Sequence, residues 1–349
     1  MSQRVLLSHA FFLDLAIAIS ECSHDRLFVL TDTTTRELCW PLLKDFIGMR
    51  HAQHITIGAT DTHKTLDTLS EVWQALGNAG ATRHSCMVCL GGGMVSDLGG
   101  FAASTFKRGI NYINIPTTLL SMVDASVGGK TGINFNGLKN EVGVFADPRF
   151  VIINTMFLRT LDMPNILSGY AEMIKHGLIS DEKTWAELMN YDIAEPDLDK
   201  LQEMVGRSVA VKQRIVEEDP HEHGIRKALN LGHTIGHALE SWALRQNAPI
   251  LHGHAVAYGM VCELYLSSVI THFPTDKLRS TVAYIRNHYG NLPITCDDYP
   301  SLFELMRHDK KNMGDTINFT LLGNIGDVKI NQTATAANIM EALDFLREG

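Results

Sequence analysis

Short apolar runs alternate with helical periodicities in the first part of the chain. Between Asp25 and about Asn154, β-rich runs such as RLFVLTD, HITIGA, CMVCLGGG and INYINIP are separated by helix-like stretches, one of them near Lys64–Gly77. Strands that alternate with helices predict a parallel sheet covered on both faces. Ligands of such sheets bind beyond the carboxyl ends of the strands. Three such strand ends are Thr31–Thr34, Gly91–Asp97 and Pro116–Thr118.

Longer helical periodicities dominate after about Thr155. They predict helices over Asn165–Ile179, Leu198–Glu217, Ile225–Leu244 and His254–Ile270, then a hairpin at Ile317–Ile330 and a final helix from Ala336. The sequence therefore predicts an α/β protein with two domains. A Rossmann-like parallel-sheet domain is expected over residues 1–155 and a mostly α-helical domain over residues 156–349.

The predicted helix Ile225–Leu244 carries one narrow polar stripe. At about 100° per residue, one face collects a guanidinium, an amide and two imidazoles. These residues are Arg226, Asn230, His233 and His237. Such groups coordinate or orient ligands, whereas a solvated helix face carries Lys and Glu. Two histidines one turn apart can bind a metal, and His252 in the following loop can complete the set. Thr234 stands where zincin metalloproteases have Glu, which disfavours that class. Histidines hydrogen-bonded within the core are the alternative.

Glu172 and Lys175 lie one turn apart in the mostly apolar stretch SGYAEMIKHG. An exposed ion pair is the usual meaning of this spacing. A buried Glu without a partner is costly, however, and the apolar surroundings predict burial. Glu172 can then complete a set with His233 and His252, the mixed N/O ligation that suits a catalytic divalent ion.

Two glycine-rich stretches are candidates for phosphate binding. CLGGGMVSDLGGF places three glycines between a strand and a helix, where backbone N–H groups and the helix dipole can meet a pyrophosphate. It lacks the G-x-G-x-x-G pattern, although Asp32 can serve the ribose, and a structural turn is the alternative. DASVGGKTG has Asp124 where a P-loop requires Gly, which disfavours an NTPase. What remains there is Lys130 near Asp124, joined by Lys139 and Asn140 from GLKNEVG.

Composition narrows the expected partners. With 349 residues, 45% of them hydrophobic and 20% charged, the chain is typical of a globular enzyme. A net charge of -9 offers no basic field for nucleic acid or an anionic membrane, so small molecules are the expected partners.

The cysteines and the N-terminus bear on the compartment. Six scattered cysteines indicate a reducing cytoplasm, and strand alternation sends Cys86 and Cys89 to opposite faces, which disfavours a redox or metal role. Arg4 precedes an apolar stretch that His9 and Asp14 interrupt, so we expect a helix followed by a strand rather than a signal peptide. No run reaches the roughly 18 apolar residues of a membrane span.

Several motifs follow one another in a specific order. They are GGGMVSDLGGF, KRGINYINIPTTLLSMVDASVGGKTGIN, LKNEVG, AEMIKHG, GIRKALNLGHTIGHALE, LHGHAVAYGM and DKKN. Together, over about Asp25 to Ile330, they resemble the 3-dehydroquinate synthase family of the sugar phosphate cyclase superfamily. The resemblance implies conversion of 3-deoxy-arabino-heptulosonate 7-phosphate to 3-dehydroquinate and phosphate, a step of the shikimate pathway. It also implies recycled NAD, a divalent metal (Zn or Co) and a homodimer.

The resemblance also implies a role for individual residues. The metal ligands are Glu172, His233 and His252, and the catalytic residues are Lys175 and the proton-transfer residues Glu222 and His237. The substrate contacts are Arg108 (from the neighbouring subunit), Asp124, Lys130, Lys139, Asn140, Lys212, Arg226, Asn230 and a lysine of the pair Lys310 and Lys311. The NAD contacts are Asp32, Asp61, Lys64, Gly92, Gly93, Asp97, Thr117, Thr118, Lys130, Lys139, Phe157, Leu158, Arg159 and Thr160.

The chain departs from the family pattern at a few positions. Ser96 replaces a common Gly and is expected to crowd the pyrophosphate, His254 replaces a Glu, and Gly137-Leu138-Lys139 replaces the order LGK. Three alternatives stay open. A sister cyclase that forms an inosose or a valiolone would share the NAD and metal frame, and a metal-dependent polyol dehydrogenase would release NADH. A degenerate NAD-binding regulator would have lost the ligands or bases.

Overall fold

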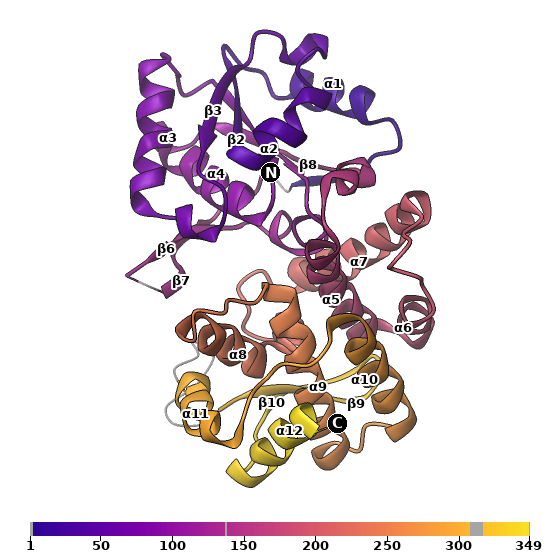
Figure 1. The fold of residues 1–349 in the computed structure, drawn as a ribbon. Helices are drawn as coiled ribbons and strands as arrows, with labels where there is room; N and C mark the ends of the chain where they lie inside the picture. Colours follow the sequence, from indigo (N-terminus) through magenta and orange to yellow (C-terminus); the bar gives the residue numbers. More distant parts are fainter. Residues whose placement is uncertain (1–2, 137, 308–316, 349) are drawn as a thin grey trace. The chain divides into compact units, whose positions relative to one another are not determined.

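The computed structural model describes residues 3–136, 138–307 and 317–348, and the chain divides into two compact units (Figure 1). Unit 1 comprises Met1–Asp162 and Asp197–Val209, and unit 2 comprises Met163–Pro196 and Ala210–Gly349. The first part of helix α7 (Leu198–Glu218) therefore belongs to unit 1.

Unit 1 is built on a six-stranded parallel sheet with the order β1-β8-β5-β4-β2-β3. The strands are β1 (Arg4–Leu7), β2 (Leu27–Asp32), β3 (Gln53–Ile57), β4 (Cys86–Gly91), β5 (Asn111–Pro116) and β8 (Phe150–Ile153). The helices are α1 (Phe11–Glu21), α2 (Thr33–Leu38), α3 (Leu66–Asn78) and α4 (Gly93–Thr105). Every residue of β2 and β4 is buried, so these strands appear in the sequence as continuous apolar runs.

Helices α3 and α4 pack on one face of this sheet. Leu30 and Cys89 from the strands form one core cluster with Leu69 of α3 and Leu98 of α4. Cys86 instead lies beside Cys22 at the end of α1, as the alternation along β4 predicts. This packing aligns β2, β4 and β5, whose carboxyl ends share one edge of the sheet.

An antiparallel ribbon of β6 (Lys130–Phe135) and β7 (Leu138–Phe145) belongs to the same unit. All of β7 is exposed, including the apolar side chains Leu138, Val142 and Phe145. Glycines and charged residues interrupt the alternation expected of a ribbon, so these two strands are not evident from the sequence.

Unit 2 is mainly helical. It contains α5 (Met163–Ser180), α6 (Glu182–Met189), the second part of α7, α8 (His233–Arg245), α9 (His252–Ile270), α10 (Thr275–Tyr289), α11 (Tyr299–Arg307), α12 (Ala336–Glu348) and the antiparallel pair β9 (Phe319–Asn324) and β10 (Asp327–Gln332). Helix α9 packs against α5, α8, α10 and α12 (Figure 1). It is apolar on nearly all sides, as a helix at the centre of a bundle must be. Among the described residues, none of the helices combines the length and apolar character needed to cross a bilayer.

The fold class predicted from the sequence is confirmed, as are the hairpin and the final helix. The single helix over Ile225–Leu244 is wrong. A 3₁₀ turn ends at Asn230, and α8 begins only at His233 after Gly232, which has φ 80°. A Cβ at Gly232 would lie 2.7 Å from Cγ of Met260, so both its backbone conformation and its contact with α9 require glycine.

Two smaller expectations concern His252 and the N-terminus. His252 is the first residue of α9 rather than part of a loop, because the helix begins two residues before its expected start. At the N-terminus, the expected helix followed by a strand is confirmed as α1 and β2. The strand β1 precedes them and was not expected, because its four residues are too few to show a period.

Candidate functional site

Three helices of unit 2 bring one carboxylate and two imidazoles together. Oε1 of Glu172 on α5 lies 3.5 Å from Nε2 of His233 and 3.7 Å from Nε2 of His252. One ligand atom from each residue lies within 4.8 Å of the others. In a tetrahedral zinc site with ligands at 2.0–2.1 Å, neighbouring ligand atoms are about 3.4 Å apart. The three side chains therefore fit a divalent ion in both donor type and spacing.

The second nitrogen of each imidazole has its own partner. Nδ1 of His233 lies 3.0 Å from the carbonyl oxygen of Leu231, and Nδ1 of His252 lies 3.2 Å from Oε2 of Glu240 on α8. A proton on Nδ1 satisfies each of these acceptors. Both Nε2 atoms then direct a lone pair towards Glu172, as metal ligands require.

The surroundings of His252 favour a positive charge. Burial lowers the pKa of this imidazole, but the carboxylates of Glu172 and Glu240 outweigh burial and raise the pKa to about 10. A divalent cation beside Nε2 would replace the second proton of this ring and would be stabilised by the same two carboxylates.

Two further predicted residues lie in this cluster. The ammonium group of Lys175 forms an ion pair with Oε2 of Glu172, and both side chains are almost completely buried. The ring of His237 lies 5.2 Å from that of His233 and 5.9 Å from that of His252, measured between centroids. An acid or base at Lys175 and His237 would thus stand directly beside the candidate ion.

Contacts that the sequence analysis missed fix the helices carrying these residues. The buried carboxylate of Glu263 on α9 accepts hydrogen bonds from the backbone N–H groups of Gly232 (2.6 Å), Thr234 (3.0 Å) and Ile235 (3.2 Å). It thereby caps the start of α8, where His233 lies. The signal was an acidic residue in the apolar run AVAYGMVCELYL, since a buried carboxylate needs donors.

A close approach fixes the other pair of helices. The N–H of Gly253 donates to Oγ of Ser168 on α5 at 3.1 Å. A Cβ at Gly253 would lie only 1.8 Å from the carbonyl oxygen of Ser168. Glu172 follows Ser168 by one turn and His252 directly precedes Gly253, so this contact sets their separation.

The segment before α8 holds the remaining predicted residues of unit 2 described here. Asp219 accepts from the N–H groups of Gly224 (2.7 Å) and Arg226 (3.1 Å), and the guanidinium of Arg226 donates to the carbonyl of Pro220 at 2.6 Å. Nδ2 of Asn230 donates to Oε1 of Glu222 at 2.8 Å. The buried Lys212 lies on α7.

In unit 1 the predicted nucleotide residues lie at the carboxyl edge of the sheet. Helix α4 follows β4 directly, and its N-cap is Gly92, which has no side chain to cap the helix. The N–H of Thr117 donates to the carbonyl of Gly91 at 3.0 Å, which joins the ends of β4 and β5. Asp32 ends β2 and accepts from the N–H of Thr35, so one of its oxygens caps α2. A helix start whose N-cap is a glycine, beside further glycines, fits a pyrophosphate.

The ribbon of β6 and β7 brings polar side chains next to predicted NAD contacts that are distant from them in the sequence. Nζ of the buried Lys64 donates to Oδ2 of Asp97 at 2.6 Å and also to Oδ1 of Asn140. Nζ of Lys139 lies 3.5 Å from Oδ2 of Asp61. Lys64 therefore links Asp97 to Asn140, and Asp61 lies beside Lys139.

Ser96 occupies the position expected to crowd a pyrophosphate. Its hydroxyl donates to the carbonyl oxygens of Gly92 (3.3 Å) and Gly93 (3.1 Å). The hydroxyl is thus bonded to the backbone of its own helix.

The other predicted residues of unit 1 lie in varied surroundings. Asp124 is half-buried in a π-helical turn, Lys130 is exposed at the start of β6, and Arg108 is exposed with φ 68°. Hydroxyl groups of Thr118 and Ser121 hydrogen-bond each other. Among the predicted residues Phe157, Leu158, Arg159 and Thr160, the first is fully buried and packs edge-to-face on Phe11, as a core residue does.

Some residues named from the sequence cannot be placed. Lys310, Lys311 and Gly137 lie outside the described residues.

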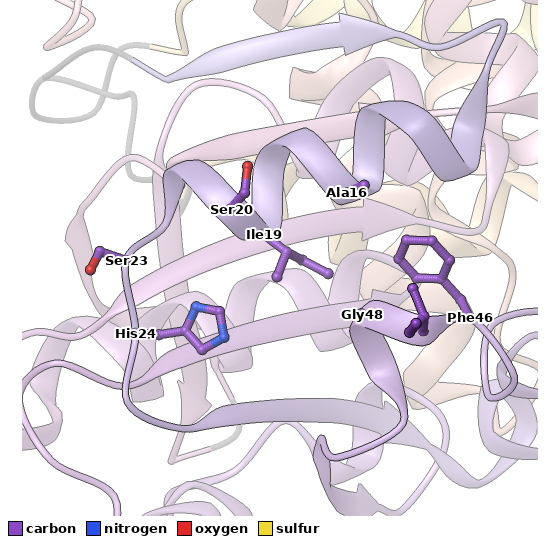
Figure 2. A pocket seen from close by; sticks show the side chains of 8 residues that line it. Ala16, Ile19, Ser20, Ser23, His24, Phe46 and Gly48 are labelled. Carbon is purple, nitrogen blue, oxygen red and sulfur yellow. The ribbon is translucent and has the colours of Figure 1, made fainter.

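An open cavity beside α1 is lined by Ala16, Ile19, Ser20, Ser23, His24, Phe46, Ile47 and Gly48 (Figure 2). None of the predicted site residues that the structure describes lines it.

Known proteins resemble this chain along its whole length. The family models described as 3-dehydroquinate synthase N-terminal and C-terminal match residues 54–168 and 169–312. A 3-dehydroquinate synthase of Parabacteroides distasonis is 56% identical, covering 99% of this chain and 98% of its own. One from Pyrococcus furiosus is 39% identical, covering 93% and 94%.

Solved structures show the same fold. The 2-epi-5-epi-valiolone synthase of Streptomyces hygroscopicus, with NAD+ and Zn2+ bound, is 26% identical with a TM-score of 0.82, covering 99% of this chain and 97% of its own. A 2-deoxy-scyllo-inosose synthase is 24% identical with a TM-score of 0.83, covering 99% and 96%. The two family models match most of the chain, and the relatives from Parabacteroides distasonis and Pyrococcus furiosus are 56% and 39% identical to it. The chain therefore belongs to the 3-dehydroquinate synthase family.

Proposed function

We propose that this chain converts 3-deoxy-D-arabino-heptulosonate 7-phosphate to 3-dehydroquinate and phosphate, with NAD and a divalent metal ion. The observation that carries the proposal is the convergence of Glu172, His233 and His252 in a chain of this family. A site that recycles its NAD needs no second substrate, so the whole reaction is a lyase reaction on one sugar-acid phosphate.

Glu172, His233 and His252 hold the metal. When bound, it lowers the pKa of the substrate hydroxyl to be oxidised and polarises the ketone that forms. The ammonium group of Lys175 forms an ion pair with the buried carboxylate of Glu172 and so balances part of its charge. Lys175 also stands close enough to the cluster to donate a hydrogen bond to a substrate oxygen.

NAD binds to unit 1 at the carboxyl edge of the sheet. When bound, it supplies a transient oxidation that makes a neighbouring C–H acidic enough for phosphate to leave. The start of α4 receives the pyrophosphate, supported by the glycines and by polar groups near them. The residues assigned are Asp32, Asp61, Lys64, Gly92, Gly93, Asp97, Thr117, Thr118, Lys130, Lys139 and the segment Phe157–Thr160. The Zn2+- and NAD+-bound valiolone synthase supports both groups for this chain.

Proton transfer is assigned to Glu222 and His237. Asn230 donates to Glu222 and so orients its carboxylate, while His237 lies beside both histidine ligands. Substrate oxygens are assigned to Asp124, Lys130, Lys139, Lys212, Arg226 and Asn230. The departing phosphate is assigned to Lys130, Asn140, a lysine of the pair Lys310 and Lys311, and Arg108, because charge-assisted hydrogen bonds to phosphate are strong.

The assembly and compartment are part of the proposal. A homodimer allows Arg108 to reach the neighbouring site. Its exposed side chain and the exposed apolar residues of β7 support such an interface. The cysteines of the chain are free thiols, five of them buried, which suits a reducing cytoplasm.

The test is an assay of purified protein with the seven-carbon keto-acid phosphate, catalytic NAD and zinc. We expect release of inorganic phosphate without net NADH, and we expect a chelator to stop it. Steady accumulation of NADH would instead support a polyol dehydrogenase. His233→Ala should lose both metal binding and activity, and full activity in that variant would refute the ligand assignment. A panel of sugar phosphates, assayed by phosphate release, separates this substrate from those of the sister cyclases.

A further inference from the structure

Glu240 is a polar residue of the cluster to which the sequence analysis gave no role. It lies on α8, seven residues after His233 and three after His237, so it continues the same helical face. Its Oε2 lies 3.2 Å from Nδ1 of His252 on α9, and its side chain is only 12% exposed. The contact therefore links the helix of one histidine ligand to the ring of the other.

The ring of His252 is held between two carboxylates. Nδ1 faces Glu240, and Nε2 lies 3.7 Å from Oε1 of Glu172. A carboxylate is an acceptor, so Glu240 favours the tautomer with the proton on Nδ1 and leaves the lone pair of Nε2 for a metal. Because a hydrogen bond to an anion also raises the basicity of the ring, Nε2 becomes the stronger donor atom.

His233 provides an internal comparison. Its Nδ1 faces the neutral carbonyl of Leu231 at 3.0 Å, which fixes the tautomer without adding charge. The ammonium group of Lys175 already balances the charge of Glu172, so this carboxylate adds little net negative charge for binding a cation. A divalent ion held by Glu172, His233 and His252 thus relies on Glu240 for further negative charge.

We propose that Glu240 is a positioning residue that orients His252 and strengthens the binding of a divalent ion by Glu172, His233 and His252. The proposal rests on the proposed function, because it takes those three residues as the metal ligands. It assigns Glu240 no contact with the substrate or the ion.

The experiment measures Zn2+ affinity of the metal-stripped full-length protein by competition with a chromophoric chelator. We expect Glu240→Ala to weaken Zn2+ binding about 10- to 100-fold, the usual effect of losing an outer-shell partner. Glu240→Gln retains an acceptor but no charge, so we expect a smaller loss, still above about threefold. The absorption bands of bound Co2+ should shift in both variants, which a purely structural role would not cause. Glu341→Gln, an exposed carboxylate on α12, is the matched control and should bind Zn2+ like the parent.

The outcomes separate the two proposals. Zn2+ affinity within about twofold of the parent and unchanged Co2+ bands in Glu240→Gln would overturn the positioning role. This isosteric variant decides the matter if Glu240→Ala does not fold. If Glu172→Ala and His233→Ala kept full Zn2+ affinity, the ligand assignment itself would fall. Loss of binding in those two variants, with none in either Glu240 variant, would leave the proposed function intact and refute only this inference.

Discussion

Replacing Gly253 by alanine tests whether helix packing sets the geometry of the proposed metal ligands. The added Cβ would lie 1.8 Å from the carbonyl oxygen of Ser168, whereas ordinary contacts begin at 3.4 Å. Helices α5 and α9 must then separate locally by roughly 1.5 Å, because the obstacle is backbone rather than a movable side chain. If the helices move apart by this amount, the distance between Oε1 of Glu172 and Nε2 of His252 increases from 3.7 Å to about 5 Å.

Metal sites tolerate errors of only about 0.2 Å in their ligand distances. We therefore expect Gly253→Ala to weaken Zn2+ binding by at least the ~10- to 100-fold that loss of an outer-shell contact costs. Overpacking should also lower the free energy of unfolding by about 1–3 kcal/mol. Chelator competition measures the first effect and urea denaturation the second.

The control is Gly77→Ala on α3, where a Cβ meets nothing within 4 Å. Alanine should leave Zn2+ affinity unchanged there and cost no stability, since it is the better helix former. If Gly253→Ala bound Zn2+ within about twofold of the parent and unfolded at the same urea concentration, the helices would have to be adaptable, and the reasoning would fail.

Two further predictions concern the supports of the site. Glu263→Gln should lower the free energy of unfolding by about 3 kcal/mol, because the amide places an N–H group against the N–H donors of α8 in place of a charged acceptor. Urea denaturation measures this loss, with Glu341→Gln as the control. A loss below about 0.5 kcal/mol would contradict the capping role of Glu263. For Asp219, partial desolvation raises the pKa, but hydrogen bonds from the N–H groups of Gly224, His223 and Arg226 outweigh it and lower the pKa from 3.8 to about 2. Its stabilising effect is therefore complete above pH 3.8 and is lost as the pH falls towards 2. The urea midpoint of Asp219→Asn should vary less with pH in that interval than the parent's, and parallel curves would exclude this role.

The sheet could be predicted from the sequence because its central strands are buried on both faces. β2 and β4 appear as uninterrupted apolar runs, and no other arrangement covers such strands as simply. The strands β1 and β8 have four residues each, which is too short for any period to emerge. Their place in the sheet follows from pairing with each other, a tertiary fact that no local pattern contains.

The residues of the candidate site could be predicted from the sequence, but the contacts that hold their helices in place could not. His233 and His237 kept their one-turn spacing, although the helix assumed to join them to Arg226 is interrupted at Gly232. A helical projection presumes an unbroken helix, and nothing in the local sequence marks the position of Met260, against which Gly232 packs. Glu240 lay on the predicted face, but its partner belongs to a different helix.

The atoms proposed as metal ligands come from three different helices, so side-chain rotation alone cannot define their positions to a few tenths of an ångström. Glu263 anchors the helix of His233 through three backbone N–H groups, and Gly253 brings the helix of His252 against the one that carries Glu172. Both contacts are buried backbone contacts, and they stabilise the helical unit whether or not a ligand binds. Substitutions should consequently fall into two classes. Changing a ligand such as His233 removes metal affinity and leaves the packing of α8 on α9, whereas changing Glu263 or Gly253 lowers metal affinity and stability together. A change at Gly253 that lowered affinity without lowering stability would separate the two properties and show that side-chain contacts alone set the ligand distances.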